Sequence, residues 1–285
     1  NAKLEFPCNF DILKNSVGVL SHSEYSKELF IKNYSLPEYN NWHVVSFIKN
    51  FPKIKEKESI RNKLNYSNKD FLICSFGFLG ETKQNHLLLE AFISSKLYKL
   101  DNCKLVYVGE NHGGEYGQKI LNTITKHNLE DKVLITGWTE SETFSDYLAI
   151  ADVSVQLRTQ SRGETSAAVF DCMSNGIATI INANGSFAEI DTDCVYMLED
   201  NFAVNDLQFA IEKLYDDEKY RKQLGENAKK LIQTKHNPEI CAKQYFDAIE
   251  TAYKNSFDIN RLISTIASIE NLPQNDKELM KIAEV

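Results

Sequence analysis

The sequence predicts an α/β fold: a doubly wound parallel sheet covered by helices. Two observations support this. From residue 70 onward, short apolar runs of β-forming residues alternate with stretches of helical spacing, and three further helical stretches follow the last run. Such alternation is typical of parallel strands joined by covering helices. The strand-like runs are residues 71–79, 104–109, 132–138, 153–158, 177–183 and 194–198.

Helical spacing fills the gaps between these runs. It is found at residues 87–92, 144–150 and 167–173, and the closing helices are expected at 204–215, 218–235 and 238–253. A Rossmann-like sheet of this kind binds ligands at the carboxyl ends of its strands, so one rim is expected to hold the functional residues. The loops expected at that rim are 78–83, 109–114, 137–138, 158–166 and 184–186.

The first 69 residues hold too few elements for a complete second domain: strand-like runs at 18–20 and 44–47, and a helical stretch at 24–33. We therefore expect three parts. Residues 1–69 are a partial domain with its connector, 70–255 the Rossmann-like domain, and 256–285 a polar helical linker. Because the chain opens at Asn1 without an initiator Met, a fragment of a longer polypeptide is expected, with a processed protein as the alternative.

Composition narrows the function classes. The formal net charge of −8 argues against a sequence-independent grip on nucleic acid, which needs clustered Lys and Arg. No apolar run approaches the roughly 18 to 20 residues that span a bilayer, which favours a cytoplasmic protein. The cysteines show no CxxC pair and are expected to be reduced core residues: Cys8, Cys74, Cys103, Cys172, Cys194 and Cys241.

The segment 161–180 carries the most information. It reads as a polar loop, a short helix that begins near Thr165 or Ser166, Gly176 as its stop, and a buried strand. The free N–H groups at that helix start form a natural anion site. Asp171 lies on this mostly apolar helix, where a carboxylate needs a partner, either a structural hydrogen bond or a ligand hydroxyl.

This segment resembles glycosyltransferase family 4 of the GT-B fold, in which an acidic residue, seven intervening residues and a Glu precede a small-residue turn. The resemblance covers roughly residues 15 to 255 in the right order. Residues 17–23 resemble the end of the family's acceptor domain, 77–83 its phosphate-binding loop, 129–152 its "Gly after strand, then helix" segment, and 184–189 its Gly-rich loop.

A closer resemblance is to the polymannan O-antigen mannosyltransferases, through the pattern at 158–169 and the loop at 109–114. It implies a retaining enzyme that transfers mannose from GDP-mannose to a growing lipid-linked surface glycan, working in the cytoplasm at the inner face of the membrane. Members of that group often carry transferase modules in tandem, which is consistent with a fragment that begins at Asn1 and with the expected linker at 256–285. Members of this fold usually need no metal or other cofactor, and Asp191-Thr-Asp193 is interpreted as a turn.

The resemblance also assigns roles to residues. Lys83 with Arg158 or Arg162 would hold the diphosphate, Glu164 the sugar and Asp171 the ribose hydroxyls. Gly77 belongs to the phosphate-binding loop, Trp138 would stack on the base, and backbone amides at Thr165, Ser166, Gly185 and Ser186 would add donors. Lys83 as a solvated surface lysine and Trp138 as plain packing are the alternatives. Glu189 would lie at a helix start near the phosphates, with a first-turn Glu that merely favours the helix dipole as the alternative, and His22 is expected at the surface.

Two positions depart from the family pattern. Phe78 follows Gly77 where most members have an Arg, and Gly163 occupies the place of the first acidic residue, with Glu164 directly after it. A loop shift of one residue would bring Glu164 to the sugar. These departures favour, as the alternative function, a non-catalytic module that positions a neighbouring transferase. A dehydrogenase domain is disfavoured because residues 77–80 lack its Gly-x-Gly-x-x-Gly turn.

Overall fold

The computed structural model describes residues 12–13, 16–34 and 41–256. Its main body is a six-stranded sheet of order β5-β4-β3-β6-β7-β8, in which every adjacent pair is parallel. The predicted doubly wound α/β fold is confirmed. The strands are β3 (Phe71–Phe76), β4 (Cys103–Val108), β5 (Val133–Ile135), β6 (Val153–Gln156), β7 (Ala178–Asn182) and β8 (Tyr196–Leu198).

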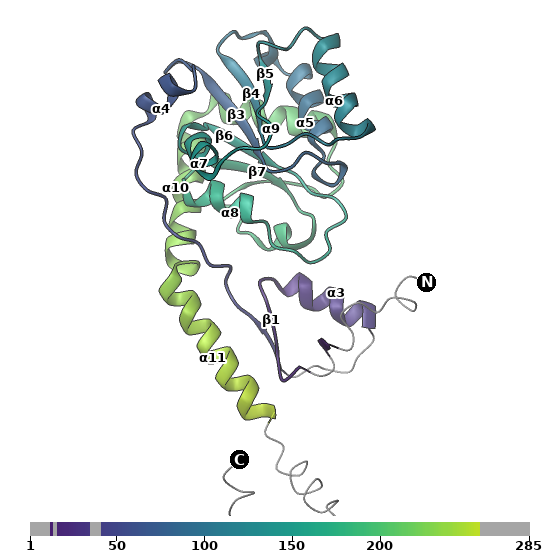
Figure 1. The fold of residues 1–285 in the computed structure, drawn as a ribbon, viewed down its shortest axis with the longest axis vertical. Coiled ribbons are helices and arrows are strands. Elements are labelled where there is room, and N and C mark those ends of the chain that lie inside the picture. The colour runs from purple at the N-terminus through teal and green to yellow at the C-terminus, as the bar shows by residue number, and fades with distance from the viewer. Residues whose placement is uncertain (1–11, 14–15, 35–40, 257–285) are drawn as a thin grey trace, which may run out of the picture.

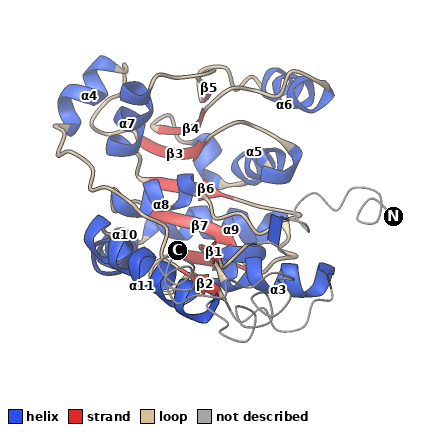
Figure 2. Ribbon diagram, turned by 60° about the horizontal axis from the view of Figure 1, so that its bottom comes forward, coloured by secondary structure: helices blue, strands red, loops and turns tan. Residues whose placement is uncertain are grey.

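Two layers of helices bury this sheet, as Figure 2 shows. The central strand β3 is buried at every residue, and its side chains alternate between the layers. Phe71 and Ile73 join the core under α5 (Asn85–Ser94), α6 (Glu115–Lys126) and α9 (Val204–Asp216). Leu72, Cys74 and Phe76 join the core under α4 (Lys57–Lys63) and α7 (Ser141–Ile150).

A third core joins α8 (Ala167–Ser174) to α10 (Glu218–Lys235) beside β7. Ala228 and Ile232 of α10 pack there with Val169 and Met173 of α8. This packing fixes α8, whose first turn faces the end of the sheet from which the long 158–166 loop emerges. In the core under α4 and α7, Ile60 of α4 packs with residues of β3 and α7.

A smaller unit precedes the sheet domain, below it in Figure 1. The strands β1 (Val19–Ser21) and β2 (Trp42–Val44) pair in parallel, and α3 (Glu24–Tyr34) lies between them in sequence. The second strand was expected at 44–47 and instead ends at Val44, because residues 45–56 run on as an extended connector to α4.

The last described helix, α11 (Pro238–Ser256), runs from the sheet domain to this smaller unit (Figure 1). Gln244 Oε1 accepts a hydrogen bond from the Ser46 amide, 2.7 Å away, which ties α11 to the connector. Residues 257–285, expected as a linker, and Cys8 lie outside the described residues. The other five cysteines are buried and unpaired. No helix in the described ranges has the length and apolar character needed to cross a membrane.

Candidate functional site

The loop after β3 brings a lysine back over the end of its own strand. Gly77 has a φ of +99°, and Lys83 ends the short 3₁₀ helix η1 (Glu81–Lys83). A Cβ built on Gly77 would lie 2.6 Å from Lys83 Nζ, so the missing side chain at 77 makes room for the ammonium group. Burial lowers the pKa of Lys83, and the neighbouring positive charge of Arg158 lowers it further.

The loop after β6 supplies Arg158. Asn182 at the end of β7 holds its backbone by two hydrogen bonds of 2.8 Å, one from the Arg158 amide and one to its carbonyl. The guanidinium lies 5.6 Å from the centroid of the Phe187 ring and forms an ion pair with Glu164. The positive charge of Arg158 is therefore balanced within its own loop.

The two loops meet at the rim. The Thr159 amide donates to the Thr82 carbonyl over 2.8 Å, and this bond holds Arg158 and Lys83 near each other. Among the described residues, Lys83 has no hydrogen-bond or ion-pair partner for its ammonium. A half-buried cation beside a second cation, without an anion of its own, marks a place that favours a negatively charged ligand.

The start of α8 lies next to this pair. Ser166 caps the helix by accepting from the Val169 amide over 3.4 Å, as expected from the sequence. The Thr165 hydroxyl is buried without a partner among the described residues. Ser186 Oγ donates to the Glu164 carbonyl over 2.9 Å, which brings the Gly185–Glu189 turn (η3) to the same place. Thr165 and Ser186 both line a cavity of about 170 Å³.

Asp171 has a structural partner that the sequence did not identify. Its Oδ1 accepts from Lys49 Nζ, 2.5 Å away, and Lys49 comes from the connector between β2 and α4. The Asp171 side chain remains 31% exposed. Within the described chain, Oδ2 has no hydrogen-bond partner, so one carboxylate oxygen is available to a ligand.

The remaining predicted residues are more open. Trp138 is 70% exposed and follows β5, the edge strand, two strands away from β3. Phe78 is half exposed, and its ring lies 5.9 Å from that of His112. Arg162 is exposed, and its amide donates to Glu164 Oε2 over 2.7 Å. Of the two arginines expected to hold the diphosphate with Lys83, Arg158 is therefore the one beside Lys83.

Helix α3 of the smaller unit packs against Gly163 and leaves little room for a side chain there. The φ of Gly163 is +95°, and a Cβ built there would lie 3.3 Å from Ser26 Oγ, which itself donates to the Gly163 carbonyl over 2.6 Å. An acidic side chain at 163 would therefore meet both backbone strain and α3. Glu164 is the only carboxylate of this short segment, and it faces Arg158.

The structure gives Glu189 and His22 partners that the sequence did not identify. Glu189 ends η3, and its carboxylate accepts from the Glu24 and Tyr25 amides (3.1 and 2.7 Å) and so caps the start of α3. His22 is half-buried, and its ring packs 5.1 Å from that of Phe47. The expected turn at 191–193 is observed, and no group of three His, Cys, Asp or Glu side chains in the described parts has a metal-binding arrangement.

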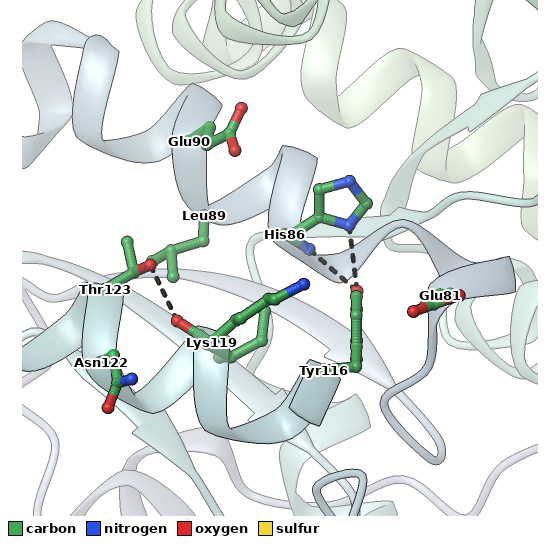
Figure 3. A pocket seen from close by; sticks show the side chains of 9 residues that line it. Glu81, His86, Leu89, Glu90, Tyr116, Lys119, Asn122 and Thr123 are labelled. Carbon is green, nitrogen blue, oxygen red and sulfur yellow. Dashed lines mark hydrogen bonds between the residues drawn. The ribbon is translucent and has the colours of Figure 1, made fainter. Parts of the chain in front are cut away.

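A larger cavity lies elsewhere, in a groove of about 590 Å³ between α5 and α6. Figure 3 shows His86 and Tyr116 side by side there, with His86 Nδ1 3.2 Å from the Tyr116 hydroxyl. None of the residues expected to bind ligand lines this groove. We place the functional site at the rim instead, because Lys83, unpaired among the described residues, and the start of α8 lie there, and the half-paired Asp171 is on the same helix.

Comparisons with known proteins agree with the α/β fold described above. Residues 56–231, more than half of the chain, match the family described as glycosyl transferases group 1. No curated protein matches the chain in sequence. The C-terminal domain of the group 1 family protein LpcC from Francisella tularensis is 19% identical with a TM-score of 0.59, and the match covers 66% of this chain and 96% of that one.

Two longer structures also share the fold. WaaG, a glycosyltransferase involved in lipopolysaccharide biosynthesis, is 17% identical with a TM-score of 0.67, over 80% of this chain and 61% of that one. HepE of Anabaena, solved with UDP and glucose, is 17% identical with a TM-score of 0.72, over 83% of this chain and 64% of that one. The chain therefore spans less than two thirds of these two neighbours.

Proposed function

The chain belongs to the glycosyl transferases group 1 family, and from this premise we propose that its rim binds the nucleotide-sugar donor of a retaining GT-B glycosyltransferase. One observation carries the proposal: the half-buried Lys83 lies beside Arg158, and among the described residues no anion pairs with Lys83. A nucleoside diphosphate is the anion that we propose for this place, since HepE, a neighbour in fold, was solved with UDP. The finer proposal is that the donor is GDP-mannose.

The chemistry follows from the charges at the rim. Sugar transfer replaces the bond between the anomeric carbon and the diphosphate oxygen by a bond to an acceptor hydroxyl oxygen. The diphosphate leaves with the electron pair, and the proton of the acceptor hydroxyl passes to the leaving phosphate. Lys83 and Arg158 would stabilise that charge as it develops, which is the main electrostatic task in such a step. Arg158 would then exchange Glu164 for a phosphate oxygen, and the released Glu164 carboxylate would accept a hydroxyl of the sugar.

The nucleoside would lie along α8. Asp171 Oδ2 would accept the ribose hydroxyls, and Trp138 would stack on the base from the end of β5. Backbone amides at Thr165, Ser166, Gly185 and Ser186 would add fixed donors to the phosphates. Gly77 contributes by leaving space for the Lys83 ammonium.

The choice of mannose and guanine is supported only by the resemblance of residues 158–169 and 109–114 to polymannan enzymes. The same resemblance supports a lipid-linked glycan of a surface polysaccharide, such as O-antigen, as acceptor. An acceptor-binding domain and further transferase modules would come from sequence beyond this chain. On this proposal the enzyme works in the cytoplasm at the inner face of the membrane.

A ligand titration tests both levels of the proposal. Ligands that bind only the native state raise the melting temperature by mass action. GDP and GDP-mannose are expected to raise it more than UDP and UDP-glucose at equal concentration. A larger shift with the uridine compounds would remove GDP-mannose and leave the donor site standing, whereas no shift with any of the four would remove the donor site.

A second function, a non-catalytic module that positions a neighbouring transferase, is favoured by one observation. The rim is partly occupied by the protein itself, since Glu164 neutralises Arg158 and Ser26 Oγ donates a hydrogen bond to the Gly163 carbonyl. Such a module would keep the fold and lose the donor. The same titration separates the two functions, because only a working donor site binds a nucleoside diphosphate.

A further inference from the structure

Lys49 is a cation on the connector whose side chain is only 13% exposed and ends on Asp171. We propose that Lys49 is a positioning residue for the ribose of the bound nucleotide, a proposal that rests on the donor site proposed above. Lys49 holds one oxygen of the Asp171 carboxylate and thereby fixes the other as the acceptor for ribose hydroxyls. Lys49 itself does not touch the ligand in this arrangement.

The connector holds Lys49 firmly. Its amide donates to the His236 carbonyl over 2.8 Å, and the Phe47 carbonyl two residues earlier pairs with His236 Nδ1 over 2.9 Å. The Lys49 ammonium also lies 5.5 Å from the centroid of the Phe47 ring, which packs against Phe170 of α8. The lysine is therefore fixed by backbone and ring contacts before it meets Asp171.

The carboxylate that it meets is only half used. Asp171 Oδ1 accepts from Lys49, while Oδ2 has no partner in the described part of the chain, and the side chain is 31% exposed. A carboxylate held at one oxygen loses less conformational freedom when a ligand binds the other. The pair thus prepares an acceptor in one orientation.

A second ion pair of the same connector shows the opposite arrangement. Lys55 Nζ lies 2.5 Å from Asp146 Oδ1, and Lys63 Nζ lies 2.9 Å from Asp146 Oδ2. Both oxygens of Asp146 are taken, and its side chain is only 5% exposed. The pair Lys55–Asp146 has the same length and a purely structural arrangement, so it provides a matched control.

The experiment compares ribose recognition in variants. Binding of GDP and of 2′,3′-dideoxy-GDP, or of the uridine pair if the wild type prefers it, is measured by calorimetry for the wild type and for Lys49→Met, Lys49→Arg and Lys55→Met. The wild type is expected to bind the ribonucleotide about tenfold more tightly than the dideoxy compound. Lys49→Met is expected to lose most of this preference, and Lys49→Arg to restore it.

Lys55→Met is expected to lower the melting temperature and keep the ribose preference. If Lys49→Met also lowers only the melting temperature and retains the full preference, Lys49 is a structural residue and the inference is overturned while the donor site stands. A wild-type chain that binds neither diphosphate overturns both. A dideoxy compound that binds the wild type as well as the ribonucleotide overturns the role of Asp171 and, with it, that of Lys49.

Discussion

Two loops at the rim each place a cation at the same site, but among the described residues only one of these cations has an anionic partner. In the loop after β3, Lys83 is half-buried, and no described residue neutralises it. In the segment after β6, Arg158 lies in an ion pair with Glu164 and over the Phe187 ring. The first loop keeps a charge ready for a ligand, whereas the second keeps its charge balanced until a ligand competes for it.

The difference has an energetic consequence. Removing a cation from water without a partner is unfavourable, so Lys83 destabilises the ligand-free fold, as its lowered pKa indicates. Arg158 has no such effect, because Glu164 compensates its charge. Substitutions in the two loops are therefore expected to change ligand affinity and protein stability in different directions.

The largest effect is expected from Lys83→Met. A charge-assisted hydrogen bond contributes about 1.5 to 3 kcal/mol, so GDP affinity should fall by about ten- to hundredfold. Guanosine, which has no phosphates, should bind as before, and the melting temperature of the ligand-free variant should not fall. Calorimetry and thermal melting measure these quantities.

Lys119→Met is the control for this variant, because Lys119 is an exposed lysine of the groove between α5 and α6. It should leave GDP affinity unchanged. A loss of affinity in Lys119→Met with none in Lys83→Met would move the site from the rim to the groove.

The next largest effect on ligand affinity is expected from Asp171→Asn, on the helix α8 that follows the β6 loop. The amide loses the charge that attracts ribose hydroxyls, so affinity should fall about tenfold for GDP and for guanosine alike. The variant should also melt at a lower temperature, since Lys49 is left largely buried without its partner. Unchanged affinity for both ligands, once the variant is folded, would show that Asp171 serves the fold alone.

These contrasts also show what the sequence could and could not predict. The sheet, its helices and the loops at its rim follow from local patterns, and α10 was predicted with the bounds that it has. The pairing of side chains does not follow from such patterns. Lys49 lies 122 residues from Asp171, and Glu189 lies 165 residues from the helix that it caps.

The apolar surroundings of Asp171 did indicate that its carboxylate needed a partner, but spacing alone could not identify a lysine on the connector. The pair between Arg158 and Glu164 was missed for another reason. It depends on backbone at Gln160 and Gly163 with φ of +56° and +95°, which no periodic pattern specifies. The ligand roles of these residues stay predictions.

A smaller effect is expected from Glu164→Gln, which releases Arg158 from its ion pair. An ion pair with one exposed partner is worth roughly 0.2 to 1 kcal/mol, so GDP affinity should rise by about 1.4- to fivefold. GDP-mannose should gain less, because Glu164 would also hold the sugar. Titration of both ligands measures the difference. Weaker GDP binding in this variant would mean that Glu164 orients Arg158 toward the phosphates instead of competing with them.

The smallest effect is a pH dependence of binding that comes from the loop after β3. The pKa of Lys83 in the free protein lies below the ordinary value of 10.5, and a bound diphosphate favours the protonated form. GDP affinity should therefore fall as pH rises through this lowered pKa.

The stability of the ligand-free protein should change in the opposite direction. Between the lowered pKa and 10.5, the unfolded chain binds more protons than the native one, so the contribution of Lys83 makes the free energy of unfolding rise with pH. Subtracting the pH profiles of Lys83→Met from those of the wild type isolates both contributions. If the difference in affinity stays constant up to the ordinary lysine range, Lys83 is a solvated lysine, and the contrast between the two loops disappears.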